Sequence, residues 1–348
     1  MRWLSTFAAH KKISYQTNHM MKELVAAFPS HLHEALQIGR KAELKPTNKT
    51  LHNIVISGLG GSGIGGKIVS QIVAEKSSLP ITCVNDYVLP AFVNEHTLVI
   101  ISSYSGDTEE TVATLHEAAA KGAEIAAVTS GGKIAAYAKE QGLNHIIIPG
   151  GNPPRSMFGY SSIQLFYMLR NYGIIDSSFE TEVEASIKLI EEDIIHIRST
   201  AKSIAEKIVK RIPILYSEAL YEGIAIRWRQ QINENSKMLC WHHVVPEMNH
   251  NELVGWTGGD NRVAVIFLRS SDDHKRSQVR MELCKNLMSE KCDTIIEIWS
   301  KGNSRIERNM YLNHVGDWLS IELAEMRNED AVAIPAIIFL KGELAKMN

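Results

Sequence analysis

Short apolar runs rich in β-branched residues alternate with segments of helical periodicity along the first half of the chain. The runs that predict strands fall at 54–57, 81–84, 98–101, 125–128 and 146–148. Helices are predicted to about residue 76 and over Glu109–Lys121. Because strands and helices that alternate at this spacing form right-handed βαβ units, the pattern predicts a parallel sheet covered by helices on both faces.

A similar alternation returns in the second half, after a segment of different character. The segment GGNPPRSMFGY at 150–160 combines Gly and Pro with little periodicity, which predicts a hinge or an inter-domain linker. Helical patterns then continue to about residue 210. The later elements are predicted as strands at 214–217, 263–268 and 294–299, helices at about 221–239 and 273–288, and two final helices. This order repeats that of the first half, so we expect two copies of one α/β unit.

The length of the chain agrees with two units. A chain of 348 residues suits about two domains. We expect an N-terminal unit over 1–150, a linker with helices over 151–210, and a C-terminal unit over 211–348. Charged residues make up 22% and the net charge is −2, a balance that favours neither nucleic acid nor an anionic membrane as a partner.

Cysteines and apolar segments bear on the compartment. The four cysteines form no CxxC pair, so we expect reduced thiols in a cytoplasmic protein and neither a disulfide framework nor a zinc ribbon. No stretch of about 18 apolar residues predicts a membrane span. The N-terminal MRWLSTFAAHKK lacks the pattern of a signal peptide.

Two loops rich in Gly, Ser and Thr each follow a predicted strand: GLGGSGIGG after residue 57, and SSYSGDTEET after residue 101. A helix N-terminus presents unsatisfied N–H groups and the positive end of its dipole, which suits a phosphate. On neighbouring parallel strands the two loops would meet at one edge of the sheet, so we predict a single phosphate site. Its candidate donors are the Gly61 backbone and the hydroxyls of Ser62, Ser103, Ser105 and Thr108.

The first of these loops also fits two other readings. Gly58, Gly60 and Gly63 satisfy G-x-G-x-x-G, and Asp86 ends the next apolar run, as a dinucleotide fingerprint for NAD requires. The glycines could also serve only tight turns and close helix packing. The second Ser- and Thr-rich loop favours a sugar phosphate, because a dinucleotide-binding fold needs no such loop.

SSYSGDTEET resembles the phosphate loop of sugar isomerase (SIS) domains. Together with NPPR at 152–155, NENSK at 233–237 and PEMNHNELVGW at 246–256, it makes the chain similar to the bifunctional phosphoglucose/phosphomannose isomerases from about residue 50 to 341. The resemblance implies an α/β fold of two SIS-type subdomains, each a parallel sheet flanked by helices. It also implies a cytoplasmic homodimer in glycolysis and gluconeogenesis that acts on a hexose 6-phosphate without a cofactor.

Glu234 lies at the edge of an apolar stripe on the predicted helix over 221–239, and Asn235 lies within that stripe. The stripe consists of Ile224, Trp228, Ile232 and Leu239. Polar residues at a core boundary are costly unless they are paired, so they favour a lined pocket. The ordinary alternative for Glu234 is a solvated helix carboxylate. The resemblance implies that Glu234 is the base that moves a proton between C1 and C2 of the sugar.

His250 lies in a polar stretch that we expect to be a loop or the start of a helix, and its imidazole can exchange a proton near neutral pH. The resemblance implies that His250 opens the sugar ring and comes from the neighbouring subunit; the alternative is a capping or surface residue. His242, His243, His250 and Glu247 also suggest a metal site. However, adjacent residues of a strand point to opposite faces, so we expect no metal.

Arg155 and Lys341 are the candidate cations. The resemblance implies that Arg155 stabilises the enediolate, a role that suits a guanidinium because it stays charged and presents a planar fork of donors. Lys341 lies in the last predicted helix, on one face with Ile334, Ile337, Ile338 and Leu344. A lysine there either extends over the apolar surface or reaches into a site. The resemblance places it near the substrate.

Two positions depart from the family. Asp107 replaces an Asn of the SIS loop, and this carboxylate would weaken anion binding unless it caps the helix that follows. Val332 replaces a Thr that would contact substrate. The implied reaction interconverts glucose 6-phosphate and/or mannose 6-phosphate with fructose 6-phosphate through a cis-enediolate. A non-catalytic SIS regulator that senses sugar phosphates remains the alternative from another functional class.

Overall fold

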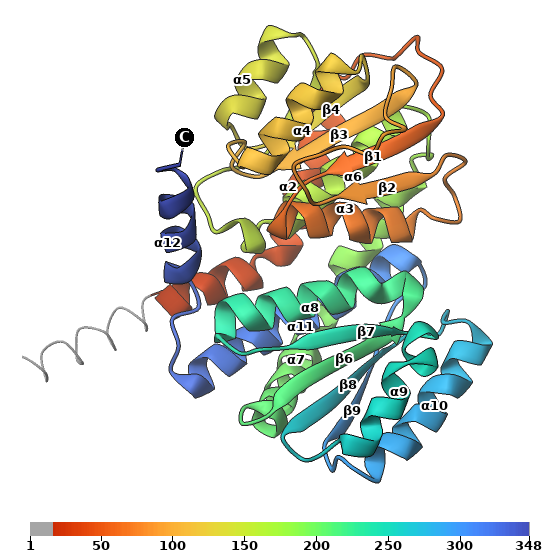
Figure 1. The fold of residues 1–348 in the computed structure, drawn as a ribbon, viewed down its shortest axis with the longest axis vertical. Coiled ribbons are helices and arrows are strands. Elements are labelled where there is room, and N and C mark those ends of the chain that lie inside the picture. The colour runs from red at the N-terminus through yellow and green to blue at the C-terminus, as the bar shows by residue number, and fades with distance from the viewer. Residues whose placement is uncertain (1–16, 348) are drawn as a thin grey trace, which may run out of the picture.

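Two parallel sheets, one from each half of the chain, lie on either side of a shared layer of helices (Figure 1). The structure is a computed structural model that describes residues 17–347. The expectation about MRWLSTFAAHKK concerns residues outside this range. The predicted α/β fold of two units, each a parallel sheet flanked by helices, is confirmed.

The first sheet has the order β2-β1-β3-β4-β5, and all its strands are parallel. The strands are β1 (Asn53–Ser57), β2 (Ile81–Val84), β3 (Thr97–Ser103), β4 (Glu124–Thr129) and β5 (Asn144–Ile147). All five were predicted. β1 and β3 are direct neighbours, with Ser57 opposite Ile101, so the two Gly- and hydroxyl-rich loops leave the sheet side by side.

Helices cover both faces of this sheet. They are α2 (Phe28–Lys41), α3 (Gly60–Ile72), α4 (Glu109–Ala120), α5 (Gly132–Glu140) and α6 (Phe158–Asn171). α3 and α6 pack against each other on the inner face. The 3₁₀ turn η1 (Pro154–Ser156) leads into α6. The segment predicted as linker and helices, 151–210, is divided between the units, since α6 packs on α2 and α3 whereas the next helix, α7 (Ser178–Ile208), packs mainly on α11 (Arg305–Arg327).

The second sheet has the order β7-β6-β8-β9 and is also parallel. Its strands are β6 (Ile212–Glu218), β7 (Trp241–Val245), β8 (Val263–Arg269) and β9 (Ile295–Trp299). β7 is the strand expected around His242 and His243. After it come η3 (Glu247–His250) and the short α9 (Glu252–Gly255).

The remaining helices of the second unit are α8 (Glu222–Ser236), α10 (Lys275–Ser289) and α12 (Pro335–Leu344). The prediction that the first of these runs to residue 239 is wrong, because Lys237 adopts a left-handed conformation with φ of 52° and ends the helix. Leu239 therefore lies outside the apolar stripe, and it is 68% exposed.

Alternate residues of the central strands face two different cores. Ile54 and Ile56 of β1 pack into the large core between the units, whereas Val55 faces the core beneath α4 and α5. In β6, Leu215 faces the shared core and Tyr216 faces a third core beneath α10. Burial of both faces explains the near-continuous apolar runs of these strands.

The units meet along α3 and α8. The Gly223 amide of α8 donates to Gln71 Oε1 at 2.8 Å, and Gln71 Nε2 donates to the Ala219 carbonyl at 2.7 Å. A Cβ at Gly223 would clash with Ile68 of α3, so a glycine permits the close approach. These contacts join the end of α3 to the start of α8, and the two helices therefore run antiparallel across the interface.

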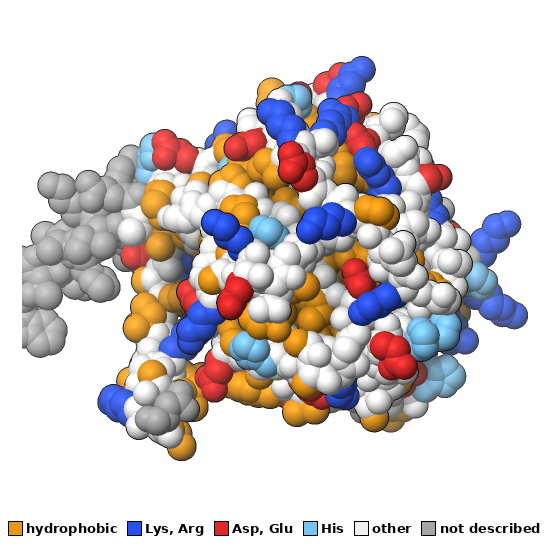
Figure 2. Space-filling model, turned by 90° about the horizontal axis from the view of Figure 1, so that it is seen from above, with side chains coloured by type: hydrophobic (Ala, Val, Ile, Leu, Met, Phe, Trp, Pro, Cys, Tyr) orange, Lys and Arg blue, Asp and Glu red, His pale blue; other side chains and the backbone are white. Residues whose placement is uncertain are grey.

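Charges are mixed on the face seen from above the first unit (Figure 2). Lys and Arg side chains are interspersed there with Asp and Glu among the described residues. The four cysteines are free. Within residues 17–347 no helix has both the length and the apolar character needed to cross a membrane.

Candidate active site

The two Gly- and hydroxyl-rich loops meet at the carboxyl edge of the first sheet. The Tyr104 amide donates to Ser62 Oγ at 2.9 Å and joins the loop after β3 to the start of α3. Ser103 Oγ donates to Thr108 Oγ1 at 3.2 Å, and Ser105 Oγ lies 3.5 Å from the same Thr108 atom. The four predicted hydroxyls therefore lie at the N-termini of α3 and α4, and we call them the hydroxyl cluster.

Close packing accounts for two glycines of the G-x-G-x-x-G pattern. A Cβ at Gly58 would clash with the carbonyl oxygen of Ser102, and one at Gly63 would clash with the carbonyl oxygen of Gly58. Gly60 has φ of +54°, a left-handed conformation that glycine adopts without strain. The turn and the close helix packing thus require these glycines, whatever ligand the loop binds.

Asp107 caps a helix other than the one considered from the sequence. Its Oδ1 accepts from the Lys133 amide at 3.0 Å, which places the carboxylate at the N-terminus of α5. The helix that follows directly, α4, begins at Glu109, and its N-cap residue, Thr108, makes no capping hydrogen bond with its side chain. The negative charge of Asp107 is therefore compensated by the N-terminus of α5, whose dipole is positive there.

Arg155 is the centre of a buried hydrogen-bond network, although it was expected in a linker. Its side chain is 5% exposed. Nε donates to Asn235 Oδ1 at 2.6 Å, and one terminal nitrogen donates to Glu234 Oε1 at 2.8 Å. The other terminal nitrogen donates to the carbonyls of Ala331 and Val332 at 2.5 and 3.1 Å. Burial lowers the pKa of Arg155, and the Glu234 carboxylate opposes this effect.

The hydroxyl cluster and Arg155 adjoin each other. Gly61, at the start of α3, packs against the backbone of Pro154 and Arg155, and an added Cβ would lie 3.4 Å from the Pro154 carbonyl oxygen. Because α3 and α8 are antiparallel, the start of α3 also lies at the end of α8 that carries Glu234. Residues from both units therefore converge on one place.

Glu234 lines a cavity of about 310 Å³ and keeps 30% of its side chain exposed. The other lining residues are Asn233, Lys237, Ala333, Ile334, Pro335, Ala336 and Ile337. The expectation of a lined pocket at the edge of the helix stripe is thus confirmed. A carboxylate that is accessible and fixed by a buried guanidinium can accept a proton from a bound molecule.

Lys237 was not singled out from the sequence, although it ends the NENSK motif. Its Nζ donates to the carbonyls of Glu234 and Asp330 at 2.6 and 2.5 Å. Burial lowers the pKa of this ammonium, and so does the positive charge of Arg155, whereas Asp330 opposes them. Lys237 thereby fixes the backbone on both sides of Arg155.

Arg227 contacts the backbone of Arg155, and it too was not identified from the sequence. Its side chain is 2% exposed and donates to Asp317 at 2.9 Å and to the Arg155 carbonyl at 3.0 Å. The guanidinium also lies 4.4 Å from the ring centroid of Phe158. The available signal was a lone Arg on the apolar side of the predicted helix, between Ile224 and Trp228.

His250 lies away from Glu234 within this chain. α8 and β7 run in opposite directions, so Glu234 lies near the start of β7 whereas exposed His250 follows its end. α8 has 15 residues and is therefore about 20 Å long. The placement of His250 in a short helical turn agrees with the expected loop or helix start.

Lys341 is exposed and lies on α12, whose first residues line the Glu234 cavity. No residue of α12 is buried, and Ile338 and Phe339 are 64% and 69% exposed. The predicted helix is confirmed, but its exposed apolar side chains are not confined to the predicted face, since Phe339 lies outside it, and nothing within residues 17–347 covers them. The structure does not bring Lys341 into the network around Arg155.

His242 and His243, the two histidines of β7, lie in different environments. His243 Nδ1 lies 2.6 Å from Glu252 Oε2, whereas His242 has a buried Nδ1 without a hydrogen-bond partner, and burial lowers its pKa to about 4. Among the described residues, no group of three or more His, Cys, Asp or Glu side chains is placed to hold a metal ion.

Comparison with known proteins adds to this geometry. The SIS domain model matches residues 50–171, and the model described as "Bacterial phospho-glucose isomerase C-terminal SIS domain" matches residues 197–344. A bifunctional phosphoglucose/phosphomannose isomerase of Caldicellulosiruptor bescii is 36% identical over 94% of this chain and 99% of its own length. The chain belongs to the bifunctional phosphoglucose/phosphomannose isomerase family. A member from Aquifex aeolicus is also 36% identical, over 84% of this chain and 90% of its own.

More distant relatives share the fold. A structure of the C-terminal domain of glucosamine-fructose-6-phosphate aminotransferase from Francisella tularensis has a TM-score of 0.73 at 12% identity, and covers 90% of this chain and 98% of its own. Tagatose-6-phosphate ketose/aldose isomerase from Escherichia coli has a TM-score of 0.62 at 13% identity, with 93% of each chain covered. The double SIS architecture thus extends well beyond this phosphoglucose/phosphomannose isomerase family.

Val332, where the resemblance implies a Thr, supports Arg155 through its backbone. Its carbonyl accepts from Arg155 at 3.1 Å, and its amide donates to Asp330 Oδ1 at 2.8 Å. Both contacts use the backbone, so the loss of the Thr hydroxyl leaves the support of Arg155 unchanged.

Proposed function

We propose that this protein is an aldose–ketose isomerase that interconverts glucose 6-phosphate and mannose 6-phosphate with fructose 6-phosphate. Membership of the phosphoglucose/phosphomannose isomerase family supports the substrate class. The observation that carries the proposal is the ion pair of buried Arg155 with accessible Glu234, next to the hydroxyl cluster. Such an enzyme would act in the cytoplasm, in glycolysis and gluconeogenesis.

The phosphate binds at the hydroxyl cluster in this proposal. Ser62 Oγ already accepts a hydrogen bond from Tyr104, so its own hydrogen is free to be donated to a phosphate oxygen. Ser103, Ser105 and Thr108 add hydroxyls, and the N-termini of α3 and α4 add backbone N–H groups near Gly61. The cluster holds the substrate, and the chemistry takes place beyond it.

Glu234 removes the C2 proton, which produces the cis-enediolate, and then returns the proton to C1. The hydroxyl proton of O2 passes to O1 in the same conversion, which leaves the C2 carbonyl of the ketose. Arg155 stabilises the developing negative charge, because its guanidinium is fixed by four acceptors before substrate binds. Lys341 is the second candidate for this stabilisation. The two aldoses differ only at C2, so rotation about C2–C3 brings either C2 proton to the same base. The mechanism uses neither a cofactor nor a metal.

His250 opens the sugar ring in this mechanism, and it acts at the site of a second copy of the chain. Its distance from Glu234 along α8 supports a homodimer that shares this histidine. The uncovered apolar side chains of α12, beside the Glu234 cavity, support the same assembly. Size-exclusion chromatography with light scattering tests the dimer directly.

A coupled assay that follows fructose 6-phosphate from each aldose tests the function. The proposal predicts turnover of both, with activity that survives dialysis against EDTA. Binding of sugar phosphate without turnover would favour the alternative of a non-catalytic SIS regulator. Tight binding of NAD would favour the alternative of an NAD-binding enzyme. Glucosamine 6-phosphate is a useful further substrate, because one relative, 31% identical over 60% of this chain, is named D-glucosamine-6-phosphate 4-epimerase.

A further inference from the structure

The second unit carries a counterpart of Arg155. Gly151-Asn152 precede Arg155 before α6, and Gly302-Asn303 precede Arg305 at the start of α11. α6 and α11 occupy matching places, because α6 packs on α2 and α3 whereas α11 packs on α7 and α8. Arg305 is therefore the residue of the second unit that corresponds to Arg155 of the first.

The first unit also carries a counterpart of Glu234. In register, Gly63, Gln71 and Ile72 of the α3 segment correspond to Gly223, Gln231 and Ile232 of the α8 segment. Glu75 then falls within one residue of the position of Glu234. Arg305 and Glu75 form an ion pair at 3.2 Å, just as Arg155 and Glu234 do at 2.8 Å. Each pair joins one unit to the carboxyl end of the helix that follows the first strand of the other unit, α3 or α8.

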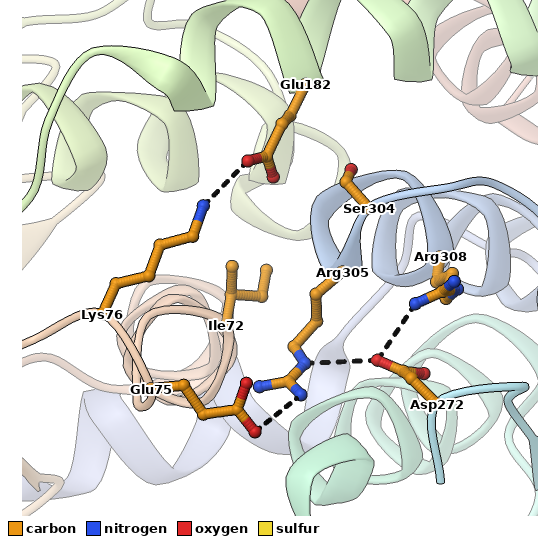
Figure 3. A pocket seen from close by; sticks show the side chains of 8 residues that line it. All are labelled: Ile72, Glu75, Lys76, Glu182, Asp272, Ser304, Arg305 and Arg308. Carbon is orange, nitrogen blue, oxygen red and sulfur yellow. Dashed lines mark hydrogen bonds and ion pairs between the residues drawn. The ribbon is translucent and has the colours of Figure 1, made fainter.

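A cavity of about 330 Å³ surrounds this second pair. Figure 3 shows Lys76, Arg305 and Arg308 around it, with Ser304 beside them and the carboxylates of Glu75, Glu182 and Asp272 as their partners. The volume is in the range of small-molecule sites. The cavity is therefore as large as the one at Glu234, but it lies at the opposite end of α3.

The cations of this cavity are only loosely engaged. Arg305 has two partners: Glu75, which is 71% exposed, and Asp272, whose Oδ2 lies 3.4 Å from Arg305 Nε. An ion pair with so exposed a carboxylate as Glu75 is weak and easily exchanged. Arg308 donates one terminal nitrogen to Asp272 at 3.1 Å, but its buried Nε has no hydrogen-bond partner. Lys76 contacts Glu182 at 2.8 Å with half of its side chain exposed. An incoming anion can thus replace these contacts.

We propose that the cavity of Lys76, Arg305 and Arg308 is a second, non-catalytic binding site for a small phosphorylated polyol of the sugar phosphate class. The three cations bind the phosphate, and the carboxylates accept hydrogen bonds from the hydroxyls of the ligand. Turnover does not occur there, because Glu218 at the end of β6 and Asp272 and Asp273 after β8 stand where the first unit has the glycines and hydroxyls that hold the substrate. A ligand at this site would bridge α3 and α11, one from each unit.

Calorimetry with anhydroglucitol 6-phosphate and with inorganic phosphate tests the proposal. The first probe lacks the anomeric hydroxyl and cannot isomerise, so no heat of turnover enters the titration. One of the two expected events belongs to the hydroxyl cluster and rests on the proposed function, and the other is identified by its dependence on Lys76 and Arg308. We expect two binding events per chain with anhydroglucitol 6-phosphate, and the second weakened more than about tenfold in Lys76→Gln and in Arg308→Gln. Lys76 is half exposed, so its replacement leaves the fold intact.

Lys67→Gln is the matched control. Lys67 also extends from α3 to the second unit, where it pairs with Glu222 at 2.8 Å, but it lies outside the cavity. Both binding events should persist in this variant. A titration in which no binding event is weakened by Lys76→Gln and Arg308→Gln would overturn the proposal. A single event that both replacements weaken would instead contradict binding at the hydroxyl cluster, which belongs to the proposed function. A second event with inorganic phosphate but not with the sugar phosphate would overturn the assigned ligand class.

Discussion

Arg155 holds Glu234 at 2.8 Å with a guanidinium that is 5% exposed, while the carboxylate keeps 30% of its side chain accessible. This difference in exposure gives each residue one role. The buried cation is fixed by Asn235 and two backbone carbonyls, so it needs no reorganisation when negative charge develops nearby. The accessible carboxylate remains free to meet a substrate proton.

Replacement of Arg155 by Lys tests the fixed cation. A lysine keeps the charge but cannot reach all the acceptors that the planar fork binds, so kcat for glucose 6-phosphate should fall about 100-fold with a smaller change in KM. Steady-state kinetics measure both. Arg170→Lys, at an exposed pair with Glu180, is the control and should leave kcat unchanged. A kcat of Arg155→Lys close to that of the wild type would contradict the role.

Mixing two inactive variants tests whether His250 acts across subunits. Glu234→Gln and His250→Ala should each be inactive alone. In a mixed dimer, one of the two sites combines an intact Glu234 with an intact His250, so an equal mixture that exchanges subunits should regain about a quarter of wild-type activity. An inactive mixture in which mixed dimers are demonstrated would contradict a shared site.

Arg227 should be essential to stability. Arg227→Met leaves Asp317 buried without its cation, and the free energy of unfolding should fall by about 3–5 kcal/mol. Urea unfolding followed by circular dichroism measures this. Arg262→Met removes an exposed pair with Asp260 and should change little. A loss below about 1 kcal/mol for Arg227→Met would show that Asp317 finds other partners.

The succession of strands and helices along the chain, the paired loops and the position of Glu234 at the edge of a helix stripe could be predicted, because each depends on local periodicity or on a short motif. What could not be predicted depends on tertiary contacts. The helix ends at Lys237, whose side chain donates to the carbonyl of Asp330, a residue far along the chain. Arg155 is buried because carbonyls of the segment before α12 surround it. No sequence pattern near either residue predicts partners so distant along the chain.

Asp273 makes stability depend on pH. Burial raises the pKa of this carboxyl to about 7, and Glu218 and Asp272 act in the same direction. The native state thus holds the proton more tightly than the unfolded chain, so this contribution is fully present below about pH 3.8 and is lost as the pH rises through 7.

Asp273→Asn removes that dependence, since the amide stays neutral. At pH 8 the variant should be more stable than the wild type by up to roughly 4 kcal/mol. At pH 4 the two should be similar. Urea unfolding at both pH values measures the difference, with Asp260→Asn at an exposed site as the control. Equal free energies of unfolding of Asp273→Asn and wild type at pH 8 would show that ionisation of the Asp273 carboxyl does not destabilise the native state.

Proton transfer by Glu234 is the central claim, and isomerisation in deuterated water tests it most directly. Glucose 6-phosphate is incubated with the enzyme, and fructose 6-phosphate and recovered aldose are analysed by NMR for deuterium at C1 and C2. A base that holds the proton exchanges part of it with solvent, so the wild type should incorporate deuterium, and Glu234→Gln should give neither deuterium nor product while it still binds substrate. Product without deuterium, or deuterium incorporation by Glu234→Gln, would contradict the account.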